Sequence, residues 1–413
     1  MLEKYLKKFE EDVITFKEAE IQELPEHMKK ERKKILYFKD VNGFQVVANL
    51  WALRERFKKI LGENIITVLL RAIEAPKEYK IRDFDMRSRS FSLLEFPFPK
   101  YYPKDGGRYI TSGVVFAEYE GKRNASFHRL MLLDDERAAI RLVPRDLYTM
   151  HKKAIERGEE IRIALAIGLE PNVLLAAATS VDYHTEELKI ASAIKHQAKE
   201  EVEIAMKTPN GNIVPYESEI ILEGRITDEY VKEGPFLDIT GTYDLVREQP
   251  VAVFEKFYVR KKPIFHLLLP GGYEHFNLMG MPREPTIYRE VKKEGVDVID
   301  VRLTPGGCSW LHGIIKIKKR REDDGKRAIY GAFRGHGSLK HVVIVDEDID
   351  IWNMEEVEWA IATRFQGDKD LIKMEKVRGS SLDPSSYEGH LTTKLGLDAT
   401  APIDEREKFR RFI

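Results

Sequence analysis

Residues 219–243, EIILEGRITDEYVKEGPFLDITGTY, decide how the rest of the chain is interpreted. The first half is an apolar run typical of a buried strand, and the second half is a turn-rich segment crowded with carboxylates. Gly234 permits unusual φ angles and Pro235 restricts its own φ, so this pair holds Glu233 and Asp238 in defined places. The two acids can therefore converge on one substrate, although a solvated loop between strands is the simpler interpretation of the composition.

The composition limits the class of protein. A length of 413 residues predicts two or three domains, and the net charge of −1 gives no field that would attract nucleic acid or an anionic membrane. We expect no nucleic-acid partner, no membrane span and a cytoplasmic location, because the N-terminus lacks an apolar signal region and every apolar stretch is short. The single cysteine, Cys308, excludes an internal disulfide and a multi-cysteine zinc site. Lysine and glutamate dominate the charged residues, as in ion-pair-rich proteins of heat-loving organisms.

Hydrophobic patterning divides the chain into three predicted domains, at 1–104, 105–288 and 289–413. In the first, residues 35–38 and 46–47 read as strands, and Asn49 is a candidate N-cap of a helix that ends at Gly62. Prolines and glycines interrupt regular structure over residues 90–107, which favours a domain boundary there.

The middle domain has many short β-type runs and few helices. Strands are predicted at 109–119, 123–133, 137–143 and 161–167, and a helix is predicted from Pro144 to Gly158. This pattern favours an antiparallel or barrel-like β core decorated by helices.

The last domain returns to α/β alternation. Strands are predicted at 296–303, 314–318 and 341–345, with a helical segment at 326–333. Asn353 and Glu356 form a predicted capping box for the following helix. The last thirty residues have little core-forming pattern and are predicted to form an arm that either wraps a partner subunit or returns to the site.

Four groups of residues are candidates for chemistry. Alternation along residues 123–129 places Asn124 on one strand face and Arg129 on the other. A guanidinium binds a carboxylate or phosphate through two parallel hydrogen bonds, yet an arginine in a strand is more often a surface residue. Asp146 and Glu187 each fall at the predicted start of a helix, where helix capping alone explains an acidic residue. Glu233 and Asp238 form the fourth group.

Ordered motifs along nearly the whole chain resemble the UbiD family of reversible decarboxylases. They are VVANL (46–50), GGRYITSG (106–113), RNASFHR (123–129), IALAIGLEP (163–171), EIILEG (219–224), EGPFLDITGTY (233–243), PGGCS (305–309), VDEDID (345–350), WAIATR (359–364) and KLGLDAT (394–400). The resemblance implies an α/β plus β fold, in which a flavin-type split β-barrel central domain is flanked by N- and C-terminal α/β regions.

The resemblance also implies the chemistry. The family decarboxylates α,β-unsaturated or aromatic carboxylic acids with prenylated FMN (prFMN), which a flavin prenyltransferase supplies, and its members form homo-oligomers from dimers to hexamers. Trans-anhydromevalonate 5-phosphate, a substrate in archaeal isoprenoid synthesis, is the expected substrate. The alternatives are a 3-polyprenyl-4-hydroxybenzoate-type decarboxylase of quinone synthesis and a non-catalytic flavin-binding protein.

Site roles follow from the resemblance, motif by motif. Arg129 and Glu233 match the family's ion pair, and Asp238 matches its proton donor. Asn124 and Glu187 match the oxygen ligands of a divalent metal, which is expected to be Mn²⁺ or alternatively Mg²⁺. A K⁺ ion is a further candidate. Asp146 stands where some members have a histidine ligand, and Leu237 stands where most have glycine. The residues expected to contact the cofactor are Phe127, His128, Arg129, Arg141, Leu142, Val143, Asp146 and Lys394.

Overall fold

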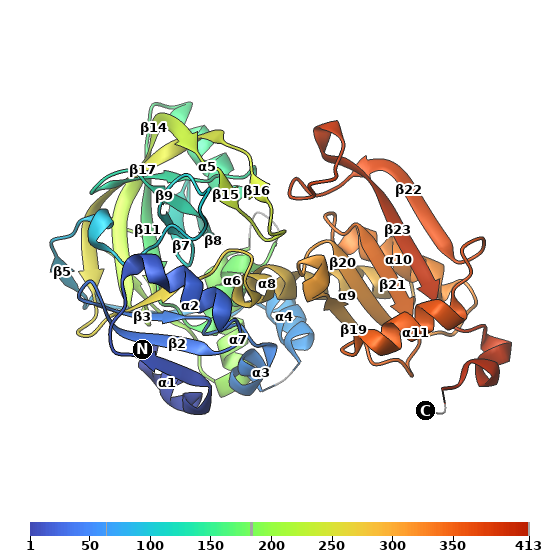
Figure 1. The fold of residues 1–413 in the computed structure, drawn as a ribbon. Helices are drawn as coiled ribbons and strands as arrows, with labels where there is room; N and C mark the ends of the chain where they lie inside the picture. Colours follow the sequence, from blue (N-terminus) through green and yellow to red (C-terminus); the bar gives the residue numbers. More distant parts are fainter. Residues whose placement is uncertain (63, 182–184, 412–413) are drawn as a thin grey trace. The chain divides into compact units, whose positions relative to one another are not determined.

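The computed structural model describes residues 1–62, 64–181 and 185–411 of the chain. These residues form two compact units, Met1–Leu278 and Met279–Ile413 (Figure 1). Both units mix helices with sheets, and the predicted fold class of α/β regions around a β-rich centre is confirmed.

The N-terminal part of the first unit is a four-stranded sheet with helices beside it. The strand order is β1 (Val13–Phe16), β2 (Ile35–Val41), β3 (Phe44–Ala48) and β18 (Ile264–Leu267). Since β18 follows the whole central region in sequence, this sheet is completed by a distant part of the chain. The helices of the first unit are α1 (Glu3–Lys8), α2 (Leu24–Lys30), α3 (Arg54–Leu61), α4 (Ile65–Glu74), α5 (Asp146–Ile155), α6 (Pro171–Ala178) and α7 (Glu187–Lys199).

One predicted cap in this region is wrong. Helix α3 begins at Arg54 with Leu53 in the N-cap position, whereas Asn49 lies further upstream in a left-handed turn with φ 56°. The Asn49 side chain donates hydrogen bonds to the carbonyls of Met28 and Glu31 instead, so its amide joins α2 to the end of β3. The other end of α3 is as predicted, because Gly62 adopts φ 79° and its N–H bonds to the Lys58 carbonyl.

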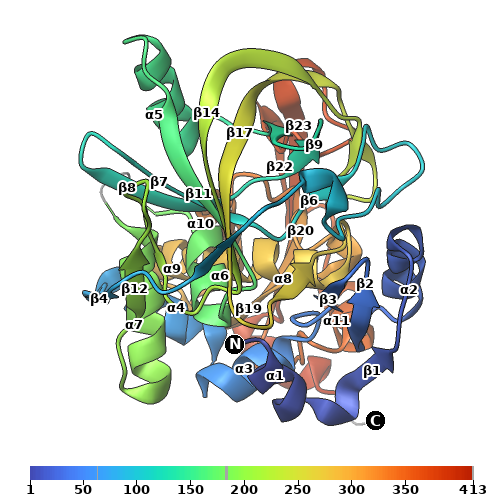
Figure 2. The ribbon, with the colours of Figure 1, turned by 90° about the vertical axis from the view of Figure 1, so that its left-hand side faces the viewer.

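The centre of the first unit is a nine-stranded sheet. Its main path runs β6 (Tyr109–Ile110), β9 (Leu130–Leu132), β10 (Arg137–Ile140), β17 (Arg247–Val259), β14 (Ile220–Glu233), β11 (Ile161–Ile167), β7 (Val114–Tyr119) and β8 (Lys122–Phe127), and β5 (Arg87–Arg89) also pairs with β17. Strands β14 and β17 are long neighbours (Figure 2) with two register shifts. At the first shift a Cβ on Gly224 would lie 2.0 Å from the Val253 carbonyl oxygen, so only glycine fits.

The curvature of this sheet follows from one short connection. Strands β8 and β9 lie near opposite ends of the strand order, yet only His128 and Arg129 join them. Three Cα to Cα steps span at most about 11 Å, so the two ends of the sheet must approach each other. The described strands therefore curl into an open barrel, with His128 and Arg129 at its seam. The sequence predicted one continuous strand over 123–133 and did not predict this break.

Smaller elements complete the first unit. The helix predicted after Pro144 is α5, which buries Leu147, Met150 and Ala154 at helical spacing, and the strand predicted at 161–167 is β11. A three-stranded sheet has the order β13 (Ile213–Pro215), β12 (Ile204–Lys207) and β4 (Lys80–Arg82), and a hairpin pairs β15 (Phe236–Leu237) with β16 (Tyr243–Asp244). Helix α8 (Tyr273–Gly280) begins near the end of this unit.

The second unit is a five-stranded sheet with helices. Its order is β19 (Asp297–Leu303), β20 (His312–Lys318), β21 (His341–Val345), β23 (Leu391–Ala399) and β22 (Leu371–Arg378), and its helices are α9 (Glu284–Lys293), α10 (Asp324–Gly335) and α11 (Met354–Arg364). Strands β20, β21 and β23 are parallel, and the two outer strands run antiparallel to their neighbours. The strands and helices predicted for this region are confirmed, with ends that differ by a few residues.

Two predictions for the second unit are wrong. Residues 391–399 do not belong to an arm, because they form β23, an interior strand of the sheet. The alternation of Thr392, Lys394, Gly396 and Asp398 hid this strand from hydrophobic patterning. The capping box is only half formed: Asn353 accepts from the Glu355 N–H as an N-cap, but Glu356 accepts from the backbone N–H of Asp350.

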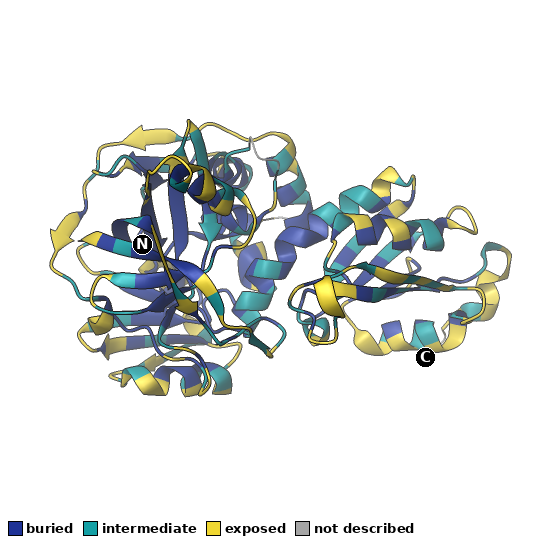
Figure 3. Cartoon of the chain, turned by 90° about the horizontal axis from the view of Figure 1, so that it is seen from above, coloured by how far each residue is buried: buried dark blue, intermediate teal, exposed yellow. Residues whose placement is uncertain are grey.

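Buried residues gather in the strands inside each unit, whereas helix outer faces and loops are exposed (Figure 3). One apolar cluster joins the central sheet to the N-terminal strands, which packs the strands beside the barrel seam against a dense interior. No helix in the described part of the chain is long and apolar enough to cross a membrane.

Candidate active site

Arg129, at the seam of the open barrel, is surrounded by three carboxylates. Its Nε and Nη2 donate to the two Glu233 oxygens at 2.9 and 3.0 Å, Nη1 donates to Asp238 Oδ2 at 2.9 Å, and Nη2 also donates to Asp244 Oδ2 at 3.0 Å. Glu233 ends the long strand β14, so the bidentate pair joins the end of this strand to the seam. The structure thus brings together the three residues that the sequence suggested for catalysis.

The guanidinium is fixed from other sides as well. Its carbon lies 4.4 Å from the centre of the Phe236 ring, and the Tyr109 hydroxyl donates to Glu233 Oε1 at 3.1 Å. Burial disfavours the charged form of Arg129, but the nearby carboxylates, Glu233 first, raise its pKa above the ordinary arginine value. Arg129 therefore stays a fixed cation while its neighbours exchange protons.

Asp238 lies in the turn between β15 and β16, where backbone contacts fix it. Its N–H donates to the Thr242 carbonyl, its own carbonyl accepts from the Gly241 N–H, and the preceding Leu237 N–H donates to Asp105 Oδ1 at 3.1 Å. The Asp238 side chain keeps 15% exposure, whereas Glu233 is fully buried. Of the two acids, Asp238 is thus the one that can exchange a proton with a bound molecule.

His275, near the start of α8, is electrostatically coupled to Asp238 and Arg129. Burial is the largest cause that lowers its pKa below the usual histidine range, the Arg129 charge adds to this, and the Asp238 charge opposes it. His275 Nδ1 accepts a hydrogen bond from the Gly271 N–H at 3.1 Å. A neutral imidazole at this place can act as a hydrogen-bond partner beside Asp238.

His128 lies at the seam on the other side of the backbone from Arg129. Its ring nitrogens contact the Arg141 carbonyl and the Ser126 hydroxyl, both at 2.9 Å. Burial, with the charges of Arg145 and Arg141, lowers the His128 pKa to about 4, so the ring is neutral near pH 7. A neutral ring held by two hydrogen bonds is suited to lining a pocket, not to supplying charge.

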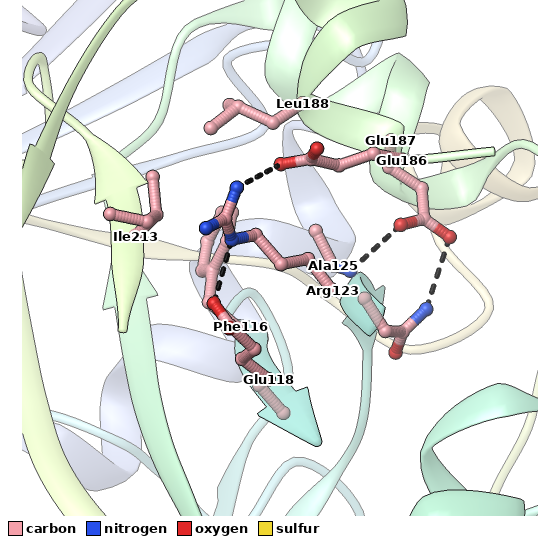
Figure 4. A pocket seen from close by; sticks show the side chains of 10 residues that line it. Phe116, Glu118, Arg123, Ala125, Glu186, Glu187, Leu188 and Ile213 are labelled. Atoms are coloured by element: carbon pink, nitrogen blue, oxygen red, sulfur yellow. Dashed lines mark hydrogen bonds and ion pairs between the residues drawn. The ribbon is translucent and has the colours of Figure 1, made fainter. Parts of the chain in front are cut away.

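A small pocket opens at the edge of the sheet, between β8 and the start of α7 (Figure 4). Glu187 accepts from the Ala125 N–H at 2.9 Å and from the Asn124 amide at 3.0 Å, so the two predicted metal ligands lie in contact. Burial raises the Glu187 pKa to about 7, and the charge of Asp146 adds to this rise. At the pocket mouth, Arg123 forms ion pairs with Glu118 and Glu186.

These donors are chemically suited to a hard cation. Glu187, Asp146 and the Asn124 amide offer only oxygen ligands, and a buried acid that resists ionisation gains from a nearby cation. In this structure Asp146 pairs with Lys122 at 2.8 Å. Among the residues that the structure describes, no three His, Cys, Asp or Glu side chains gather into a metal-binding group. The protein alone therefore offers two carboxylates and an amide, and a phosphate would complete the coordination.

The remaining predicted cofactor residues are placed as follows. Phe127 ends β8, and Arg141, Leu142 and Val143 follow β10, where the Leu142 N–H donates to Gln249 at 2.7 Å. Arg141 carries a pKa below the ordinary arginine value, because it is partly buried and lies near Arg247 and Arg129. Lys394 lies in the second unit, on β23, where its ammonium donates to the Gly337 carbonyl at 2.6 Å.

Sequence reasoning missed three residues of this site. Tyr109, His275 and Asp244 contact the catalytic group or are coupled to it, but each is far from the others along the chain or carries no motif of its own. Two of them had a sequence signal: Tyr109 lies in the motif GGRYITSG (106–113), and Asp244 directly follows the motif EGPFLDITGTY (233–243).

The comparisons with known proteins agree over the whole chain. Three family profiles match in order: the N-terminal domain (residues 6–75), the Rift-related domain (75–273) and the C-terminal domain (276–399) of 3-octaprenyl-4-hydroxybenzoate carboxy-lyase. The anhydromevalonate phosphate decarboxylase of Methanocaldococcus jannaschii is 46% identical over 93% of both chains. The corresponding protein of Methanothermobacter thermautotrophicus is 45% identical over 89% of this chain and 88% of its own.

A solved structure gives the same result for the fold. The UbiD-class enzyme HmfF from Pelotomaculum thermopropionicum, in complex with FMN, superposes with a TM-score of 0.95 at 32% identity, over 100% of this chain and 97% of its own. An evolved dimeric form of that enzyme, in complex with prFMN, gives 0.91 at 31% identity, over 100% of this chain and 96% of its own. Profiles, relatives and fold define a carboxy-lyase, an enzyme that removes CO₂ from a carboxylic acid. The chain belongs to the UbiD family.

Proposed function

We propose that this enzyme decarboxylates trans-anhydromevalonate 5-phosphate, with prFMN and a divalent metal bound. The observation that carries the substrate is the name shared by several relatives at 44 to 46% identity, all of them anhydromevalonate phosphate decarboxylases. Loss of CO₂ from this acid and addition of one proton at the same carbon yields isopentenyl phosphate.

The residues of the site divide the work of such a reaction. Arg129 offers its guanidinium to the substrate carboxylate, and Glu233 holds it in place through the bidentate pair. Asp238, partly exposed and bonded to the same guanidinium, holds the proton that replaces CO₂ on the substrate carbon. The prFMN ring, when bound, supplies the electron sink that lets CO₂ leave an alkene carbon.

The phosphate of the cofactor would be held at the Asn124 and Glu187 site. A divalent metal, Mn²⁺ or Mg²⁺, fits this donor set, because carboxylate, amide and phosphate oxygens are the ligands that hard cations prefer. Phe127 ends β8, His128 follows it, and the Arg141 backbone bonds to both His128 and Arg129, so a flavin would extend along these residues. Asp146 would join the metal only if it left Lys122.

A second candidate function comes from a different relative. The phenolic acid decarboxylase of Escherichia coli is 31% identical over 72% of this chain, so an aromatic acid is the alternative substrate. The test is CO₂ release from enzyme that has been co-expressed with a flavin prenyltransferase. Turnover of the phosphorylated aliphatic acid, with none of 4-hydroxybenzoate-type acids, supports the proposal, and the reverse preference refutes it. No release from any acid would favour a non-catalytic flavin protein.

A further inference from the structure

The donors of Arg129 are almost fully used by the protein. A guanidinium carries five N–H groups. Glu233 takes one from Nε and one from Nη2, Asp244 takes the second from Nη2, and Asp238 takes one from Nη1. Within the described part of the chain, the fifth N–H, on Nη1, has no protein acceptor. A substrate carboxylate can thus reach Arg129 without displacing a protein group only at Nη1, beside Asp238.

Asp244 is built into this place by strand register. In the hairpin of β15 and β16 it pairs directly with Phe236, the residue whose ring packs against the guanidinium. Its Oδ1 accepts from Arg247 at 2.6 Å and from the Leu245 N–H at 2.9 Å, which leaves Oδ2 directed at Arg129. With 6% exposure and two cationic neighbours, its carboxylate stays in one orientation.

The charges around Asp238 explain what this orientation does. Arg129 and Arg247 pair with the carboxylates of Glu233, Asp244 and Asp238, and the nearby cation Arg141 balances the third negative charge when all three acids are ionised. An entering substrate carboxylate adds a further negative charge beside Arg129. The other titratable groups near Asp238 are His275, from α8, and Asp105, whose carboxylate accepts from the Leu237 N–H.

We propose that Asp244 is a positioning residue for the decarboxylation: it occupies Nη2 of Arg129 and so directs the substrate carboxylate to Nη1, next to Asp238. The identity of the reaction rests on the proposed function. The placement of the carboxylate on Arg129 does not depend on it. Asp244 does not touch the reacting carbon and acts through Arg129.

The placement is tested by crystal structures with acetate, a small carboxylate probe. In the wild type, acetate should contact Nη1 of Arg129 beside Asp238. In Asp244→Asn, the amide can no longer hold Nη2 by charge, and acetate should shift to Nη2. Any other placement of acetate in the wild type, or the same placement in both proteins, overturns the proposal, whatever the true substrate is.

The kinetic consequence is tested with Asp244→Asn and a matched control. We expect kcat to fall about tenfold, the equivalent of one charge-assisted hydrogen bond, while KM does not rise, because the variant cluster is less negative toward the substrate. The basic limb of the pH profile should move to lower pH, because the variant lacks one negative charge beside Arg129. Asp134→Asn, which breaks an exposed pair with Arg137, should change none of these values.

The outcomes separate the two proposals. A wild-type enzyme that turns over only another acid refutes the proposed substrate, and the comparison of pH profiles is then made with that acid. An unshifted pH profile in Asp244→Asn refutes the role of Asp244 even if the substrate is correct. A fall in kcat together with a rise in KM and a loss of thermal stability shows a merely structural residue and also overturns the proposal.

Discussion

Replacing Arg129 by methionine should destabilise the first unit strongly. Methionine keeps much of the volume and the contact with the Phe236 ring, so the main loss is the cation. Glu233, which is fully buried, would remain without its bidentate partner, and Asp244 would lose one of its two guanidinium contacts. Breaking a buried ion pair by removing one partner costs about 3 to 5 kcal/mol, and we expect a loss of this size near pH 7.5.

The pH dependence gives this prediction a sign. Against the effect of burial, Arg247 and Arg129 hold the pKa of Asp244 below its usual value, so Arg129 adds stability at neutral pH that is lost on acidification, and the variant lacks this contribution. Its stability should therefore rise relative to that of the wild type on acidification, and the deficit should shrink. An effect of lost packing alone would not change with pH.

Hydrogen exchange under increasing urea measures the opening free energy of residues 219–259, which include β14 and β17. Arg137→Met is the control, because Arg137 forms only exposed pairs with Asp134 and Glu229 and should cost at most about 1 kcal/mol. A deficit for Arg129→Met no larger than that of the control, or one that is equal at pH 7.5 and pH 5, would refute the reasoning.

Three further predictions address the proton, the metal and the packing of the first unit. Asp238→Asn should lower CO₂ release by about a hundredfold or more while flavin absorbance and folding persist, and near wild-type turnover would transfer the donor role to Glu233. Glu187→Ala should reduce metal content and flavin retention together, as read by elemental analysis and absorbance; unchanged values of both would count against the shared site. Glu170 has a pKa lowered to about 2, because the charges of Lys195 and Lys4 outweigh its burial. This carboxylate should stabilise the fold by about 3 kcal/mol above pH 4.5, and the contribution should be lost as the pH falls from 4.5 to 2. In urea unfolding, Glu170→Gln should therefore be much less stable than the wild type at pH 7 but little different from it near pH 2.

The sequence predicted regular elements well where periodicity was strong. Strand β11 and strand β21 have the predicted bounds, because each is mainly apolar, with Arg162 and His341 as the polar exceptions. Asn49 was misread because an amide before a helical pattern looks like a cap, whereas its position depends on contacts with the C-terminal end of α2. Strand β23 escaped detection because polar residues alternate along it and tertiary pairing with β21 decides its structure.

The site was predictable only in part. The Arg129, Glu233 and Asp238 roles came from motif resemblance, and the structure adds the hydrogen bonds that join them. Residues 123–133 fit the pattern of one strand, so the sequence did not indicate the break between β8 and β9 that places Arg129 at the seam. Asp244 was missed because its role depends on hairpin register and on the number of N–H groups that one guanidinium offers.

The most direct measurement is the reaction of prFMN-loaded enzyme with trans-anhydromevalonate 5-phosphate in D₂O. The account predicts equimolar CO₂ and isopentenyl phosphate, with one deuterium at the terminal alkene carbon that had carried the carboxylate, and loss of this product in Asp238→Asn. Intact substrate, with no CO₂ and no deuterium exchange from an enzyme whose flavin and metal are in place, would contradict it.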